Sequence, residues 1–161
     1  MGPSSDPIVG EFFQIAYVTK DIQRGMALFA EHYAMPEFAI VKTREFANPA
    51  PPYLTLALAY RGSVMIELVE PEPCNLDLYI DALRDDGGLN IHHLAYFMDP
   101  EEFETLEERF NARGIATPDI RRNGRYPILF ADTRKETGLY SEFIAVPREK
   151  RATFGRLIPR Y

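Results

Sequence analysis

The chain has little of three things: cysteine, long apolar runs and excess positive charge. A single cysteine, Cys74, excludes an internal disulfide framework and is typical of proteins in the reducing cytosol. No apolar stretch approaches the roughly 20 residues that a membrane-spanning helix needs, and no secretory hydrophobic region opens the chain. The formal net charge of −6 argues against a nucleic-acid-binding protein, because such proteins favour a basic face. We therefore expect a cytoplasmic protein with neither a nucleic-acid nor a membrane partner.

Composition and length are those of an ordinary globular protein. Hydrophobic residues make up 46% and charged residues 26% of the 161 residues. This length suits one compact domain, or two small modules that share a core. Small, polar and proline residues predict a disordered lead-in over 1–10, and residues 148–161 are expected to form a C-terminal tail.

The hydrophobic pattern of residues 11–71 predicts a first module with the order β-α-β-β-β. Aromatic and β-branched residues over 11–18 indicate a strand. Asp21 can then cap a helix with apolar residues at helical spacing, and Pro36 ends it. The remaining strands are predicted over 37–47, 53–61 and 64–70.

The same order recurs over residues 90–147, after a linker over 72–89 with a short helix at 76–85. The stretch DPEE at 99–102 predicts a helix start, with Asp99 as N-cap and Pro100 in the first helical position. Asn123-Gly124 predicts a hairpin turn. The strands of this half are predicted over 90–98, 115–122, 125–131 and 139–146. The repeated order predicts two tandem βαβββ modules.

Four polar or charged residues interrupt apolar strands at matching points of the two halves. They are Gln14, Glu67, His93 and Glu142, with 53 residues separating the first pair and 49 the second. Strand alternation places Phe12 on the face of Gln14, and Met65 and Val69 on the face of Glu67. By the same rule, Tyr17 and Tyr96 point to the opposite side, as core or interface aromatics.

A divalent cation would explain why these four residues stand in apolar strands. An ionised carboxylate buried without a partner costs several kcal/mol. Two glutamates balance the charge of one divalent cation, and His and Gln add two neutral ligands. Three oxygen donors and one imidazole suit six-coordinate Mg, Mn, Co, Ni or Zn. Two coordination positions would remain for water or for a chelating substrate.

Each residue also has a plain structural explanation. Glu67 alone could be a solvated edge residue, and Gln14 alone a hydrogen-bonded strand residue. His92 is adjacent to His93 and faces the opposite way by alternation, so we expect it at the surface or at an interface. His32 is expected to be a solvated helix residue. The coincidence across four strands in one symmetrical plan favours the metal site.

Four motifs spanning nearly all of residues 12–147 resemble the vicinal-oxygen-chelate (glyoxalase/bleomycin resistance/extradiol dioxygenase) superfamily: FQIAYVTKDI, IELVEP, GLNIHHLAYFMDP and TGLYSEFIAV. The segment that begins IHHLAYFMDP is especially similar to methylmalonyl-CoA epimerase. This resemblance implies an α+β fold, in which two tandem βαβββ modules form a U-shaped mixed sheet around a metal-lined cleft. The family's ligand positions, on the first and last strand of each module, correspond here to Gln14, Glu67, His93 and Glu142.

The ligand set departs from the epimerase pattern. Epimerases typically place His first and Gln second, whereas this chain has Gln14 first and Glu67 second, a set that resembles certain glyoxalase I enzymes more closely. Extradiol dioxygenase chemistry is disfavoured, because the two-His, one-carboxylate set of non-heme iron enzymes is not found.

The resemblance implies a metal-dependent isomerase, epimerase or lyase. Such an enzyme would stabilise an enediolate of an acyl-CoA or similar 2-substituted carbonyl substrate with its metal ion. Glu142, or else Glu67, would abstract the proton. Arg44, Arg122 and Arg125 would contact an anionic group of this small-molecule substrate. One divalent ion (Zn, Ni, Co, Mn or Mg) and a homodimer are expected. A glyoxalase I-like lyase and a metal-free, drug-sequestering binding protein are the alternatives.

Overall fold

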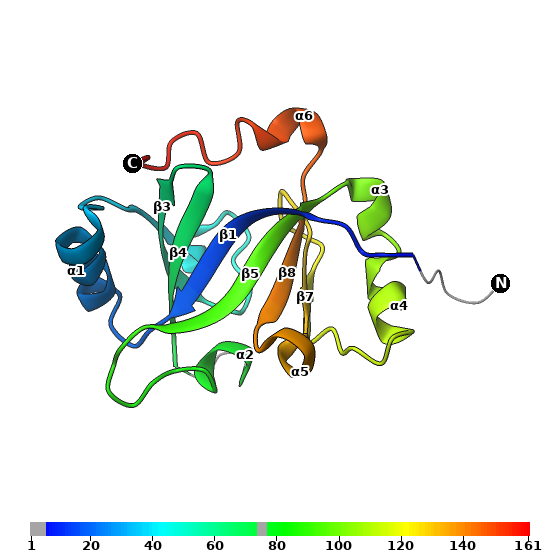
Figure 1. Cartoon of the computed structure of the whole chain (residues 1–161), viewed down its shortest axis with the longest axis horizontal. Coiled ribbons are helices and arrows are strands. Elements are labelled where there is room, and N and C mark those ends of the chain that lie inside the picture. Colours follow the sequence, from blue (N-terminus) through cyan, green and yellow to red (C-terminus); the bar gives the residue numbers. More distant parts are fainter. Residues whose placement is uncertain (1–5, 74–76) are drawn as a thin grey trace. The chain divides into compact units, whose positions relative to one another are not determined.

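The computed structural model of the protein describes residues 6–73 and 77–161 (Figure 1). Residues 1–5 of the predicted lead-in, Cys74, and the start of the predicted linker helix at Leu76 lie outside the described residues. The chain divides into two compact units. One runs to Phe13 and resumes over His93–Phe154, and the other comprises Gln14–His92 and Gly155–Tyr161. Within 6–73 and 77–161, no helix is long and apolar enough to cross a bilayer.

The first half of the chain follows the predicted β-α-β-β-β order. Its elements are β1 (Glu11–Val18), α1 (Ile22–Tyr33), β2 (Ala39–Lys42), the 3-10 helix η1 (Thr43–Glu45), β3 (Leu54–Arg61), β4 (Val64–Pro71) and α2 (Asp77–Ile80). Asp21 caps α1 as predicted, because its side chain accepts a hydrogen bond from the backbone N–H of Arg24 at 3.0 Å.

The second half repeats the plan with a divided helix. Its elements are β5 (Asn90–Met98), α3 (Pro100–Phe103), α4 (Leu106–Asn111), β6 (Asp119–Arg121), β7 (Ile128–Ala131), α5 (Arg134–Thr137), β8 (Tyr140–Ala145) and α6 (Arg148–Arg151).

The strands form a mixed sheet in the order β2-β3-β4-β1-β5-β8-β7-β6. β1 pairs with β4 in parallel, and β5 pairs with β8 in the same way. The β2–β3, β3–β4, β6–β7 and β7–β8 pairs are antiparallel. The α+β class, the tandem βαβββ order and the mixed sheet are therefore confirmed. The metal lining of a cleft and the residue bounds of the modules stay predictions.

Several elements are shorter than the sequence predicts. The strand predicted over 37–47 ends at Lys42, because the Thr43 hydroxyl accepts the backbone N–H of Leu54 at 2.8 Å and donates to the Pro52 carbonyl at 3.2 Å. These bonds turn the chain away from the sheet. The strands predicted over 115–122 and 125–131 shorten to β6 and β7.

Asp99 stands at the start of α3, but its side chain makes no capping hydrogen bond. Its carboxylate instead accepts hydrogen bonds from Arg148 at 2.9 Å and Arg151 at 2.7 Å. Asp99 is therefore the N-cap residue, as predicted, but its carboxylate forms ion pairs instead of a capping hydrogen bond. These ion pairs link α3 to α6.

In the unit containing Gln14–His92, α1 covers one face of the strands. Ile22 and Phe29 of α1 pack with Ala57, Ala59 and Leu68, and Tyr17 borders this cluster. Alternation along β1 and β4 therefore turns the side chains of Gln14 and Glu67 to the face opposite α1. The prediction that Tyr17 points away from these two residues is confirmed.

In the unit containing His93–Phe154, α3 and α4 cover one face in the same way. Phe103, Leu106 and Phe110 pack against Leu129, Ala131, Phe143 and Ala145, and Tyr96 borders this cluster. Since Leu129 and Phe143 face the helices, Phe130 and Glu142 face the opposite side. We call this opposite side of β5, β8, β7 and β6 the site face.

Both faces of each central strand are covered at one point. Phe13 and Gln14 are consecutive and both buried, as are His92 and His93. Phe13 stacks on Phe97 with ring centroids 3.8 Å apart, whereas Phe12 is 43% exposed. Phe12 is therefore not buried beside Gln14, and its place on the same face of the strand stays a prediction.

Candidate functional site

Gln14 and Glu67 form a buried hydrogen-bonded pair across β1 and β4. Gln14 Nε2 donates to Glu67 Oε2 at 2.9 Å, and the two residues are 3% and 9% exposed. In the parallel register Gln14 lies opposite Met65, so Glu67 is two residues beyond its partner. The amide supplies a donor to a carboxylate that would otherwise be costly to bury.

His93 and Glu142 form the equivalent pair across β5 and β8. His93 Nε2 lies 3.2 Å from Glu142 Oε2, and the residues are 1% and 6% exposed. His93 lies opposite Tyr140, so Glu142 is again two residues beyond the register partner. The Phe130 ring meets the His93 ring edge-on at 5.0 Å. The two halves therefore place their polar residues by the same strand register.

The structure thus brings together Gln14 with Glu67, and His93 with Glu142. Convergence of the two pairs on one cation stays a prediction. Within the described part of the chain, no three His, Cys, Asp or Glu side chains are grouped to hold a metal ion.

The chemistry of the donor set fits the divalent cation that the superfamily implies. Each pair combines one carboxylate with one neutral polar group, and all four residues are buried. Oxygen donors with one imidazole suit Mg, Mn, Co, Ni or Zn. The Gln14 amide now directs its N–H to Glu67. To act as a ligand it must present Oε1, because only the oxygen has a lone pair to donate.

The three arginines predicted to contact substrate are placed differently from one another. Arg44 donates from Nε to Glu72 at 3.0 Å and lies over the Tyr53 ring at 3.7 Å. The hydrogen bond from Arg44 holds the pKa of the Glu72 carboxyl below its usual value. Arg125 lies over the Tyr126 ring, 5.4 Å from its centroid.

Arg122 lies on the helix-covered face. Its guanidinium is within ion-pair distance of Glu107 at 3.4 Å and Glu104 at 3.8 Å, and it stands over the Phe103 ring. This is the face opposite His93 and Glu142. Substrate contact by Arg44, Arg122 and Arg125 stays a prediction.

His92 is a buried residue whose contacts the sequence did not reveal. It is 3% exposed, its Nε2 donates to the Leu78 carbonyl at 2.7 Å, and its ring stacks on Tyr79 at 5.1 Å. The prediction of a surface or interface position is wrong, because α2 folds back over this residue. The apolar residues Leu78 and Tyr79 in the linker were the sequence feature that could have indicated a segment packed against the strands. His32 is solvated as predicted, with a side chain 59% exposed.

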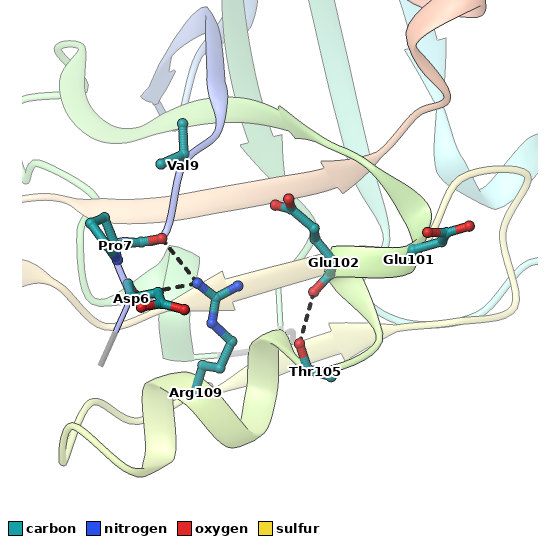
Figure 2. Close-up of a pocket in the computed structure, with 7 residues that line it drawn as sticks. All are labelled: Asp6, Pro7, Val9, Glu101, Glu102, Thr105 and Arg109. Atoms are coloured by element: carbon teal, nitrogen blue, oxygen red, sulfur yellow. Dashed lines mark hydrogen bonds between the residues drawn. The ribbon is translucent and has the colours of Figure 1, made fainter. Parts of the chain in front are cut away.

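A cavity of about 400 Å³ lies between residues 6–9 and the helices α3 and α4 (Figure 2). The side chain of Arg109, on α4, extends toward residues 6–9 and donates from Nη2 to the Pro7 carbonyl at 3.0 Å. Thr105 donates to the Glu102 carbonyl at 3.3 Å. Because α3 and α4 cover the face opposite His93 and Glu142, this cavity is not part of the candidate site. Its lining residues are Asp6, Pro7, Val9, Glu101, Glu102, Thr105 and Arg109.

Comparison with known proteins identifies a superfamily. The sequence profile of the Glyoxalase/Bleomycin resistance protein/Dioxygenase superfamily matches residues 13–131. No curated protein matches the chain in sequence.

Solved structures of similar fold include a hypothetical protein and two epimerases. The hypothetical protein BH1468 from Bacillus halodurans C-125 is 18% identical, with 88% of this chain and 97% of that chain covered and a TM-score of 0.60. Methylmalonyl-CoA epimerase from Mycobacterium tuberculosis is 16% identical, with coverages of 93% and 95% and a TM-score of 0.56. A variant of the Streptomyces coelicolor methylmalonyl-CoA epimerase, in complex with 2-nitronate-propionyl-CoA, is 15% identical, with coverages of 88% and 97% and a TM-score of 0.60. At these identities the likeness shows the fold alone.

Proposed function

Because this chain belongs to the glyoxalase/bleomycin resistance protein/dioxygenase superfamily, we propose that it is a divalent-metal-dependent enzyme that moves a proton at the carbon next to a carbonyl group. The substrate class is a 2-substituted acyl thioester or a similar carbonyl compound, and the reaction is an epimerisation or isomerisation. The observation that carries this proposal is the buried His93–Glu142 pair on parallel strands. The fold shared with methylmalonyl-CoA epimerases supports the substrate class.

In this proposal Gln14, Glu67, His93 and Glu142 hold the cation. When bound, it supplies Lewis-acid polarisation of the substrate carbonyl. The four side chains fix its place, because all are buried and come from the middle of strands rather than from loops.

Glu142 acts as the general base. One of its carboxylate oxygens takes the proton from the carbon next to the carbonyl, and a proton returns to the same or to the other face; only return to the other face epimerises the carbon. Glu142 is 6% exposed and shares its face of β8 with the buried Ile144, so water has little access to this carboxylate. Glu67 is the alternative base, at the equivalent position of the other half.

A glyoxalase I-like lyase is the second candidate. The observation that favours it is the Gln14–Glu67 pair, which places an amide first and a carboxylate second. Both reactions move a proton next to a carbonyl group. They differ in substrate, because the lyase acts on a glutathione hemithioacetal and the epimerase on an acyl thioester.

The test is proton exchange catalysed by the protein loaded in turn with Mg, Mn, Co, Ni and Zn. Methylmalonyl-CoA is incubated in D₂O, and deuterium at C2 is followed by mass spectrometry. In parallel, the hemithioacetal of methylglyoxal and glutathione is assayed for conversion. Exchange at C2 supports the epimerase, and conversion of the hemithioacetal alone supports the lyase. A protein that takes up no metal and turns over neither compound contradicts the proposal and leaves a ligand-sequestering protein.

A further inference from the structure

We infer that the cavity between residues 6–9 and the helices α3 and α4 binds a small apolar α-amino acid. The two helices cover the face of the strands opposite the site face, so this ligand site is separate from the candidate metal site. The inference does not depend on the proposed function, because it uses none of the residues assigned to the metal or to the substrate.

The size and lining of the cavity suit a small molecule. Its volume of about 400 Å³ falls within the range of about 300–1,000 Å³ that is usual for ligand pockets. Pro7 and Val9 provide an apolar wall, and Val9 is 71% exposed. The other lining residues are polar or charged. This mixture favours a ligand that combines a short apolar side chain with charged groups.

Arg109 has hydrogen-bond donors that the described chain does not use. Its bonds to the carbonyls of Pro7 at 3.0 Å and Asp6 at 3.4 Å both come from Nη2. Within residues 6–73 and 77–161, Nη1 makes no hydrogen bond, and the buried Nε has no partner either. Buried donors in folded proteins nearly always have an acceptor. Arg109 can therefore bind a carboxylate in the cavity while it still holds residues 6 and 7.

Glu102 and Thr105 offer acceptors for a positively charged group. The Glu102 carboxylate extends toward the space that the Arg109 guanidinium also borders, whereas the Glu101 carboxylate points away from it (Figure 2). Among the residues that the structure describes, Arg109 and Glu102 form no ion pair with each other. The Thr105 hydroxyl donates its hydrogen to the Glu102 carbonyl, so its oxygen can only accept from a ligand.

A zwitterion matches these opposite charges. The carboxylate and the ammonium of an α-amino acid are attached to one carbon, so the carboxylate can bind Arg109 while the ammonium binds Glu102 and Thr105. Both contacts are charge-assisted hydrogen bonds, which are stronger than those between neutral groups. The side chain of the amino acid would then lie against Pro7 and Val9.

The charges around the cavity restrict the class of amino acid. Three carboxylates, those of Asp6, Glu101 and Glu102, line the cavity together with one guanidinium, that of Arg109. The resulting negative potential disfavours an acidic side chain. Neutral amino acids with an apolar side chain remain as the ligands that the lining fits.

The test measures binding of leucine, valine and methionine to the full chain by titration calorimetry. The protein is first dialysed free of metal, because amino acids chelate divalent ions. Leucinamide lacks the carboxylate and 4-methylpentanoate lacks the ammonium, while both keep the side chain of leucine. Aspartate tests the exclusion of acidic side chains.

The variants are Arg109→Gln, Arg109→Lys and Glu102→Gln, each with a matched control. Arg113→Gln is the control for Arg109, because Arg113 also donates to the Asp6 carbonyl but is not among the lining residues. Glu108→Gln is the control for Glu102, because Glu108 is an exposed glutamate of α4 outside the lining.

We expect the wild type to bind one leucine per chain, and to bind leucinamide, 4-methylpentanoate and aspartate at least about 10-fold more weakly. Arg109→Gln and Glu102→Gln should each weaken leucine binding by about 10-fold or more. Arg109→Gln should not weaken leucinamide binding, and Glu102→Gln should not weaken 4-methylpentanoate binding, because each ligand lacks the group concerned. Arg109→Lys should have an intermediate effect, and it provides a second test if Arg109→Gln fails to fold. Both control variants should bind leucine as the wild type does.

Other results overturn the inference. A wild type that binds none of leucine, valine and methionine would do so, as would equal binding of leucine, leucinamide and 4-methylpentanoate. Equal weakening of leucine binding by Arg109→Gln and Arg113→Gln would mean that both act by anchoring residues 6 and 7 and not by contact with the ligand. Amino-acid binding here and proton exchange at the candidate site are separate measurements, so failure of one is distinguishable from failure of the other.

Discussion

The imidazole of His93 faces the carboxylate of Glu142 at 3.2 Å across two parallel strands, with Glu142 two residues beyond the register partner of His93. Gln14 and Glu67 repeat this offset across β1 and β4. Two pairs with little sequence identity around them therefore occupy equivalent positions. A shared register of this kind is what a duplicated ligand site requires.

Replacing Glu142 by Gln should remove the proposed base while keeping the shape of the side chain. We expect turnover to fall by about 10²- to 10⁴-fold, the usual contribution of general base catalysis. Circular dichroism and the unfolding midpoint show whether the fold survives. Glu136→Gln, an exposed glutamate of α5, is the matched control and should keep wild-type turnover. Near wild-type activity in Glu142→Gln would remove Glu142 from the mechanism.

Exchanging Gln14 and Glu67, the proposed ligands of the first half, tests why this chain departs from the epimerase pattern. In the double variant Gln14→His with Glu67→Gln, the set has one carboxylate instead of two. A cation held by this set would keep more of its positive charge and would polarise a carbonyl more strongly. We expect metal binding to persist and C2 exchange of methylmalonyl-CoA to rise relative to hemithioacetal conversion. A fall in that ratio would argue that Gln14 and Glu67 do not set the reaction.

His92 should contribute to stability through α2. His92→Phe keeps an aromatic ring against Tyr79 but leaves the Leu78 carbonyl without its donor. Loss of a partner for a buried polar group costs about 1–3 kcal/mol. Urea unfolding of the metal-free protein measures the change. His32→Phe makes the same substitution at an exposed site and should change stability by less than about 0.5 kcal/mol. Equal effects at the two positions would contradict this role.

Asp99 should make stability depend on pH in the acid range. The hydrogen bond from Arg148 holds the pKa of the Asp99 carboxyl below its ordinary value of 3.8, with further help from Arg151. The folded state therefore binds this proton less tightly than the unfolded chain. The stabilisation is complete above the ordinary pKa and is lost as the pH falls through the lowered value.

Thermal unfolding between pH 5 and pH 2, in one metal-free buffer series, measures this dependence. The wild type should lose stability more steeply than Asp99→Asn, and the two curves should converge at the acid end. Arg148→Gln removes the principal partner of Asp99, so it should make stability less dependent on pH, as Asp99→Asn does. Parallel curves for wild type and Asp99→Asn would show that this ion pair does not contribute to the pH dependence of stability.

Local rules explain what the sequence predicted correctly. Period-two alternation along β4 places Glu67 on the face opposite Leu68, and α1 indeed covers Leu68. Alternation is sufficient there because no residue interrupts the pattern. The candidate pairs themselves followed from their matching places in two repeated orders of elements.

Long-range pairing explains what the sequence could not predict. Arg121 and Arg122 are equivalent by composition, and only the register of β6 against β7 separates their faces. His92 is buried because α2 returns over it, which no local pattern encodes. The helix after Asp99 divides at Glu104 and Thr105, although the spacing of Phe103, Leu106 and Phe110 fits one continuous helix.

Metal content tests the central claim most directly. The purified protein is dialysed free of metal and titrated with Zn, Ni, Co, Mn and Mg by calorimetry, and bound metal is then counted by elemental analysis. The account predicts one divalent ion per chain, with affinity reduced by more than about 10-fold in both His93→Asn and Glu67→Gln, one variant from each pair. A wild type that binds no divalent ion, or variants from both pairs that bind it as tightly as the wild type, would contradict it.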